Sequence, residues 1–161
     1  MASTKDIRLA LKDVLSQAPS LSEIKTWHMV TGFIPDAFAP TGSVGSGRTV
    51  YAEYTNDLDE ATTTLPVYIA VSEADPERAE EIVQALGEEA RAVLVSDNPT
   101  LGGLVSRVNA EELAFDTAVA DGDLLVHYVT LNLSISHWSP RIRPTTDPTA
   151  DTVDLTVEQE V

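Results

Sequence analysis

The chain has 161 residues, of which 43% are hydrophobic and 22% charged, a composition typical of one globular domain with a buried core. It contains no cysteine, which excludes disulfides, thiolate zinc sites and a cysteine nucleophile. No apolar run approaches the roughly 18 residues that span a bilayer, and 10 basic against 26 acidic residues give a net charge of −16, which disfavours both a membrane location and tight binding of nucleic acid.

The acidity also bears on the solvent in which the chain works. Only three of its basic residues are lysines. At low ionic strength such a charge repels itself and weakens the compact state, whereas near 1 M salt the screening length falls to about 3 Å. The composition resembles that of proteins from salt-accumulating halophilic archaea. The alternative is an acidic protein from an ordinary milieu.

The first predicted element is a helix over residues 4–18. Thr4 can cap its start and Pro19 ends it. Its apolar residues share one face of a 3.6-residue period, and they are Ile7, Leu11, Val14, Leu15 and Ala18.

An extended segment and a long loop are expected next. Residues 22–31 contain several β-branched residues around Trp27, which favours a strand. Residues 32–48 hold four glycines and two prolines, a density typical of a loop. Loops of this length are usually functional or mobile.

Two further strands are predicted at 49–55 and 65–71, separated by an acidic connector at 56–60. The connector is interpreted as a solvated loop. The alternative is a calcium site formed by Asp57, Asp59 and Glu60.

The second helix has the strongest signals in the sequence. Asp75 can cap it, Pro76 suits its first turn, and an apolar stripe runs from Ala79 to Leu94. Asn98-Pro99 ends it, and Leu101-Gly102-Gly103 predicts a turn. The strand predicted at 104–115 has an irregular middle that indicates a bulge.

The last part of the chain is predicted to be a turn at Asp121-Gly122, a strand at 124–137 with one buried face, and an extended arm. The arm, residues 139–161, holds three prolines and an alternation of Val153, Leu155 and Val157. Such an alternation can add a strand to a neighbour's sheet edge. The alternative is a frayed terminus.

These elements predict an α+β fold in which residues 1–138 form a single domain and residues 139–161 form the C-terminal arm. Two helices would pack on one face of a mainly antiparallel sheet of four to five strands. The long Gly/Pro-rich loop would lie outside these layers.

Candidate chemical sites are weak. Residues 42–49 depart by one residue from the phosphate-binding pattern GxxxxGK[ST], with Arg48 in place of the lysine, but neither a preceding strand nor a following helix is predicted. His127 and His137 are ten residues apart on one predicted strand, about 33 Å, too far to share a metal. We therefore expect no catalytic, cofactor-binding or metal-binding residues, and no enzyme.

The predicted work of the chain is instead to form interfaces. Tryptophan and arginine are enriched at interface hot spots, and two arginines directly after Trp138 give the arm a local positive charge on an acidic protein. The interface candidates are Trp27, Arg48, Leu101, Gly102, Gly103, Trp138, Arg141 and Arg143.

The order of helix, capped second helix, Leu-Gly-Gly turn and closing alternating strand resembles the tail terminator (tail completion) proteins of long-tailed viruses. The resemblance covers residues 4–138 and is most specific from Ala79 to Val105. There a helix reading Ala-Glu-Glu-Ile-Val-Gln-Ala-Leu precedes Ala-Arg-Ala-Val-Leu, Asn98-Pro99 and Leu-Gly-Gly. The loop at 32–48 and the arm are larger than the family needs.

The resemblance implies a structural virion protein that forms a hexameric ring on the last ring of the tail tube, ends tube polymerisation and joins the tail to the head connector. Its partners would be copies of itself, the major tail tube protein and a head-connector or neck protein, while DNA would pass through the lumen without specific binding. It would be found in the virion tail or neck, and in the host cytoplasm during assembly, with a halophilic archaeon as the host.

Two alternatives remain open at this point. One is another neck component, such as a head-completion or adaptor protein. The other is a small cytosolic ligand-binding protein or enzyme that uses the glycine-rich loop.

Overall fold

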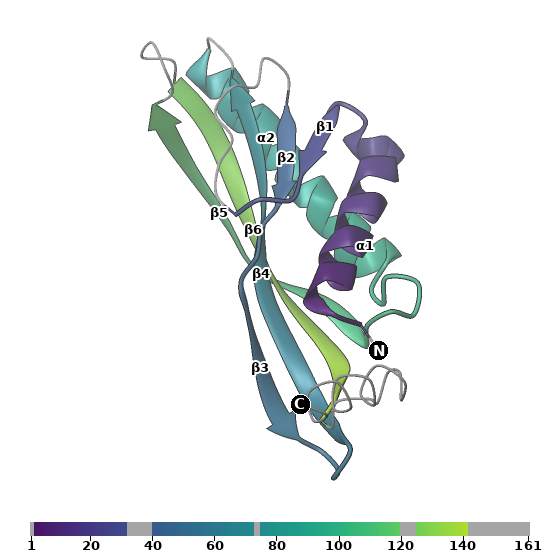
Figure 1. The fold of residues 1–161 in the computed structure, drawn as a ribbon. Helices are drawn as coiled ribbons and strands as arrows, with labels where there is room; N and C mark the ends of the chain where they lie inside the picture. The colour runs from purple at the N-terminus through teal and green to yellow at the C-terminus, as the bar shows by residue number, and fades with distance from the viewer. Residues whose placement is uncertain (1, 32–39, 73–74, 120–124, 142–161) are drawn as a thin grey trace, which may run out of the picture.

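The computed structural model describes residues 2–31, 40–72, 75–119 and 125–141. It is an α+β fold in which two helices cover one face of a mixed sheet (Figure 1). This confirms the predicted class and layers. The sheet has six strands rather than four or five, because one strand lies within the predicted loop.

Both helices begin with a side-chain cap. α1 (Thr4–Gln17) is capped by Ser3 and not by Thr4: the Asp6 N–H donates to Ser3 Oγ, and the Ser3 N–H donates to the Asp6 carboxylate. The short 3₁₀-helix η1 (Pro19–Leu21) follows. α2 (Pro76–Arg91) is capped by Asp75, as predicted, and continues into the π-helix η2 (Ala92–Asp97).

The sheet has the order β1-β2-β4-β6-β5, with β3 also paired to β4. β1 and β2 are parallel, and every other pair is antiparallel. The strands are β1 (Thr26–His28), β2 (Thr41–Val44), β3 (Arg48–Glu53), β4 (Leu58–Ser72), β5 (Arg107–Val119) and β6 (Leu125–Pro140).

The loop prediction was wrong for β2, all four residues of which are buried. Its glycine allows close packing: a Cβ on Gly42 would lie 2.4 Å from the Trp27 ring. A Cβ on Gly47, just before β3, would lie 1.8 Å from the Thr64 carbonyl oxygen. The glycines of this segment therefore let backbone approach ring and backbone, rather than only breaking secondary structure. Residues 32–39 of the predicted loop lie outside the described residues.

The acidic connector was predicted too long. β4 already begins at Leu58, so the link from β3 is a tight hairpin in which the Tyr54 and Thr55 N–H groups donate to the Leu58 carbonyl. Asp59 and Glu60 are consecutive residues of a strand, so their side chains point to opposite faces. This arrangement is incompatible with the calcium site considered from the sequence.

The hydrophobic core lies between the helices and one half of the sheet. α1 contributes Ile7, Leu11 and Leu15, and the alternate residues of β6 from Val129 to Ile135 are fully buried, as predicted. Gly87 of α2 sits against Leu113 and Val129, where a Cβ would be only 3.1 Å from each side chain. The predicted bulge in β5 is present between Ala110 and Glu112.

The boundaries of the last elements differ slightly from expectation. β6 runs to Pro140, so the sheet includes the first two residues of the predicted arm. β1 is limited to three residues of the expected 22–31 segment. The turn predicted at Asp121-Gly122 and the predicted C-terminal arm from residue 142 onward lie outside the described residues.

Candidate interaction surface

Half of the sheet projects beyond the helices. β4 and β6 pair from Leu58↔Pro140 to Ser72↔Val126, which at about 3.4 Å per residue makes a ribbon about 50 Å long. The helices pack on the half nearer Ser72, and the other half carries β3 along its edge (Figure 1). We call this projecting part, residues 48–64 and 134–140, the arm of the sheet. It offers surface that the core does not need.

A buried polar ladder crosses the three strands of this projecting part. The hydroxyl oxygens of Thr49 and Thr63 are 2.8 Å apart, and Thr63 Oγ1 lies 2.8 Å from His137 Nε2. Burial lowers the pKa of the His137 imidazole below its ordinary value of 6.5. The imidazole is therefore neutral at pH 7, and the ladder fixes the register of β3 against β4 and β6 without a buried charge.

The helix-free face of the arm of the sheet carries an apolar strip of three residues, Val50, Tyr54 and Trp138. Val50 pairs with Thr62, whereas the core-facing residues of β4 have odd numbers, such as Leu65. Val50 is 56% and Tyr54 63% exposed. The Tyr54 and Trp138 rings contact each other, with centroids 4.8 Å apart. An exposed aromatic side chain such as Tyr54, in contact here with the half-buried Trp138, is a typical anchor of protein interfaces.

The tip of the same hairpin is held by Arg141. Its N–H donates to the Asp57 carbonyl over 2.8 Å, and its guanidinium pairs with the Glu53 carboxylate. Both side chains are solvent-exposed, so water and salt screen the ion pair and it adds little to stability. The contact nevertheless places the end of the described chain beside the β3–β4 hairpin.

The interface candidates predicted from the sequence are scattered. Trp27 is only 7% exposed and packs over Gly42, which makes it a core residue and not a surface anchor. Arg48 begins β3, so it starts a strand where a phosphate-binding loop would start a helix. Trp138 lies on the arm of the sheet, and Arg141 follows β6 at the tip of this arm. Arg143 lies outside the described residues.

The Leu101-Gly102-Gly103 turn forms as predicted but stands apart from β3. All three residues have positive φ, at 49°, 71° and 92°. Leu101 is buried, while both glycines are exposed. A shallow hollow of about 420 Å³ joins residues 103–106 to Trp138, so this turn borders the β6 side of the arm of the sheet.

Val50 and Tyr54 are not among the interface candidates predicted from the sequence. The sequence signal for them was that the short strand around Tyr51 carries apolar residues on both of its faces. Val50 and Tyr54 lie on one face, and Tyr51, which is 59% exposed, lies on the opposite face. A strand with one buried face shows apolar residues on alternate positions only.

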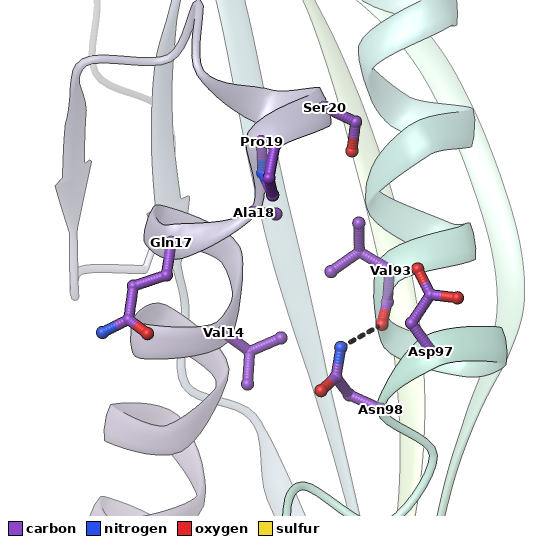
Figure 2. Close-up of a pocket in the computed structure, with 8 residues that line it drawn as sticks. All are labelled: Val14, Gln17, Ala18, Pro19, Ser20, Val93, Asp97 and Asn98. Carbon is purple, nitrogen blue, oxygen red and sulfur yellow. Dashed lines mark hydrogen bonds between the residues drawn. The ribbon is translucent and has the colours of Figure 1, made fainter.

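A second hollow lies between the end of α1 and η2. Figure 2 shows its lining, which includes Gln17, Asp97 and Asn98, and the 2.8 Å hydrogen bond that the Asn98 amide donates to the Val93 carbonyl. Its volume is about 280 Å³ and it is open to solvent. Asp97 is the single ionisable side chain among the residues that line it, so the hollow lacks the paired groups of general acid–base chemistry.

The histidines are separated, as their spacing indicated. His127 and His137 lie at opposite ends of β6, and His28 lies on β1 at the edge of the sheet. Within the described ranges, no group of three or more His, Asp or Glu side chains is placed to hold a metal ion.

Comparison with known proteins identifies no relative. No protein-family model matches the sequence, and no curated protein matches it. Among the described residues no helix is long and apolar enough to cross a membrane.

Proposed function

We propose that the chain is a structural subunit of a virus particle, which assembles into a ring that caps the tail tube, ends its polymerisation and joins the tail to the head connector. The observation that carries the proposal is the arm of the sheet. It extends the sheet past its own core, has a free strand at its edge and exposes an apolar strip. Contiguous exposed apolar surface of this kind marks sites of protein–protein contact, which a ring subunit needs.

The charge supports the same proposal. A ring of subunits with 16 net negative charges each surrounds its lumen with a negative potential, which repels DNA phosphates and allows passage without adhesion. The proposed host is a halophilic archaeon, because concentrated salt screens the repulsion between subunits of like charge.

The first test is the mass of the assembly. Native mass spectrometry and light scattering in about 1–2 M salt, chosen from the screening length, should show a closed oligomer, with six copies as the expected number. The variant Val50→Ser combined with Tyr54→Ser should dissociate it. The matched control is Leu9→Ser, which removes a similarly exposed apolar side chain, 40% exposed, from α1. A chain that stays monomeric at every concentration and salt, alone and with tail tubes, contradicts the proposal.

The second test concerns position in the particle. Purified tail tubes mixed with gold-labelled chain should carry label at one end, and tube growth should stop there. A head-completion or adaptor protein would instead label isolated heads at the portal. Label on heads and none on tubes would replace the tail-terminator proposal by the other neck component.

A further inference from the structure

The free edge of β3 differs from the other long edge of the sheet. Within the described residues β3 pairs with β4 alone, so alternate N–H and C=O groups along its outer side point away from the sheet. Its central residues, 49–52, read Thr-Val-Tyr-Ala and carry no charge. The edge is therefore a template for one more strand.

The outer edge of β5, by comparison, has features that prevent it from pairing with another strand. It has the bulge after Ala110, and Glu111, Glu112 and Asp116 lie within its length. Bulges and charges of this kind are the usual devices that prevent edge-to-edge pairing. The contrast between the two edges indicates that β3 is the one left open for a partner.

The end of the described chain lies at the tip of the hairpin that carries this open edge. The Arg141 N–H donates to the Asp57 carbonyl in the β3–β4 hairpin, and 20 further residues follow it. Residues 152–158 read Thr-Val-Asp-Leu-Thr-Val-Glu, in which apolar and polar residues alternate with the period of a strand. Strand addition needs this pattern, because one row of side chains contacts the acceptor and the other remains in water.

The charge of this segment favours β3 over a second copy of the segment. Two copies paired with each other would bring Asp154 and Glu158 close to like charges, which is destabilising. Beside β3 the same carboxylates face the uncharged central residues 49–52, and the one carboxylate of that strand, Glu53, is already paired with Arg141. Its apolar row, with Leu155 at the centre, matches the exposed Val50 and Tyr54 of the apolar strip.

The connecting residues favour donation to a neighbour. The segment from 142 to 151 contains Pro144 and Pro148, which favour extended backbone. At about 3.1 Å per residue these ten residues span about 30 Å. β3 lies two strand spacings from β6, so a strand added to the subunit's own β3 edge would lie only about 14 Å, three spacings of about 4.8 Å, from β6, and β6 points past the tip of the hairpin.

We propose that residues 152–158 of one subunit add as a strand to the free edge of β3 in the neighbouring subunit, with Val153, Leu155 and Val157 against the apolar strip. The inference rests on the proposed function only in requiring a neighbouring copy of the chain. If this contact repeats around a ring, each subunit donates one strand and accepts one. Such head-to-tail contacts generate a closed ring.

Introduced cysteines test this directly, since the chain has none of its own. Val50→Cys and Leu155→Cys chains are mixed in high salt and oxidised, in parallel with a short bis-maleimide that bridges the roughly 7–8 Å between diagonal neighbours across a strand pair. We expect a covalent dimer containing one chain of each kind, identified by peptide mass spectrometry. The control pair, Leu9→Cys with Leu155→Cys, should give at least tenfold less of the covalent dimer that contains one chain of each kind.

The double variant Val50→Cys/Leu155→Cys separates the possible occupants of the edge. Donation to a neighbour gives a ladder of covalent multimers, whereas return to the subunit's own β3 gives a monomer with an internal link and overturns the inference. Dimers of Val50→Cys alone would place a second β3 on the edge and also overturn it. Rings without any Val50–Leu155 link overturn the inference but leave the proposed function intact, while a chain that never associates overturns both.

Discussion

The packing of Trp27 over Gly42 gives the sharpest test of the fold, because it joins β1 and β2 in the segment whose sequence predicts a loop. In Gly42→Ala the new methyl carbon would lie 2.4–2.7 Å from three carbons of the Trp27 ring. The ring is 7% exposed and cannot swing into solvent without opening the core. Overpacking of this kind costs about 1–3 kcal/mol, which corresponds to a decrease in melting temperature of about 2–12 °C for a domain of this size.

A double-mutant cycle with Trp27→Phe isolates the clash. The smaller ring gives the methyl group room, so the combined variant should be more stable than the sum of the two single losses by about 0.5–3 kcal/mol. Urea unfolding in high salt measures the four free energies. The control is Gly102→Ala, at φ 71° with open space around it, which should lose about 1–2 kcal/mol by backbone strain and show no coupling to Trp27. Additivity of Gly42→Ala with Trp27→Phe would refute the observed contact.

Four further predictions concern the ladder, the cap and the charge. Burial lowers the pKa of His137, so around this pKa the folded state binds fewer protons than the unfolded chain. The free energy of unfolding should therefore have its full value above pH 6.5 and decrease as the pH drops below 6.5. In His137→Gln this decrease, measured by chemical unfolding at several pH values, should be smaller. Thr63→Val leaves the hydroxyl of Thr49 and Nε2 of His137 without their shared partner and should cost about 1–3 kcal/mol in urea unfolding, more than Thr49→Val at the outer end of the ladder. Ser3→Ala removes the N-cap of α1 and should cost about 0.5–2 kcal/mol, while Thr4→Ala should cost less, as measured by thermal unfolding. The melting temperature of the whole chain should rise between about 0.1 and 2 M KCl as screening removes the self-repulsion of 16 net charges, and an unchanged value would contradict the halophilic interpretation.

The elements with strong local signals could be predicted from the sequence. The cap and apolar stripe of α2, the alternation in β6 and the bulge in β5 each depend on residues close together in the chain. β2 could not be predicted, because its glycine, Gly42, is explained only by Trp27, 15 residues earlier, and Gly47, which lies between β2 and β3, is explained only by Thr64, 17 residues later. Propensity treats such glycines as breakers, whereas tertiary contact makes them a requirement.

Only some residues of the candidate interaction surface could be predicted from the sequence, for a similar reason. Strand alternation reports that one face of β4 and β6 is apolar, but it does not report how far the helices reach along that face. Trp138 and Arg141 were identified by residue type, while Val50 and Tyr54 emerge only from the pairing of β3 with the uncovered half of β4. Trp27 shows the opposite error, since a tryptophan chosen as an interface anchor is buried within its own subunit.

Charge and surface together set the conditions for association. In the proposed assembly, each approaching pair of subunits would have to overcome the repulsion between their net charges of −16, which at low ionic strength reaches far beyond the apolar strip. Concentrated salt would limit this repulsion to charges in direct contact, so that burial of Val50, Tyr54 and Trp138 would drive association. Salts that are excluded from the protein surface, such as sulfate, would strengthen this hydrophobic contribution. Salt should therefore promote assembly of this chain, the reverse of its effect on interfaces formed by complementary charges. In the proposed assembly, an acidic subunit whose edge strand is uncharged at its centre would stay apart from its neighbours in dilute salt and join them in brine.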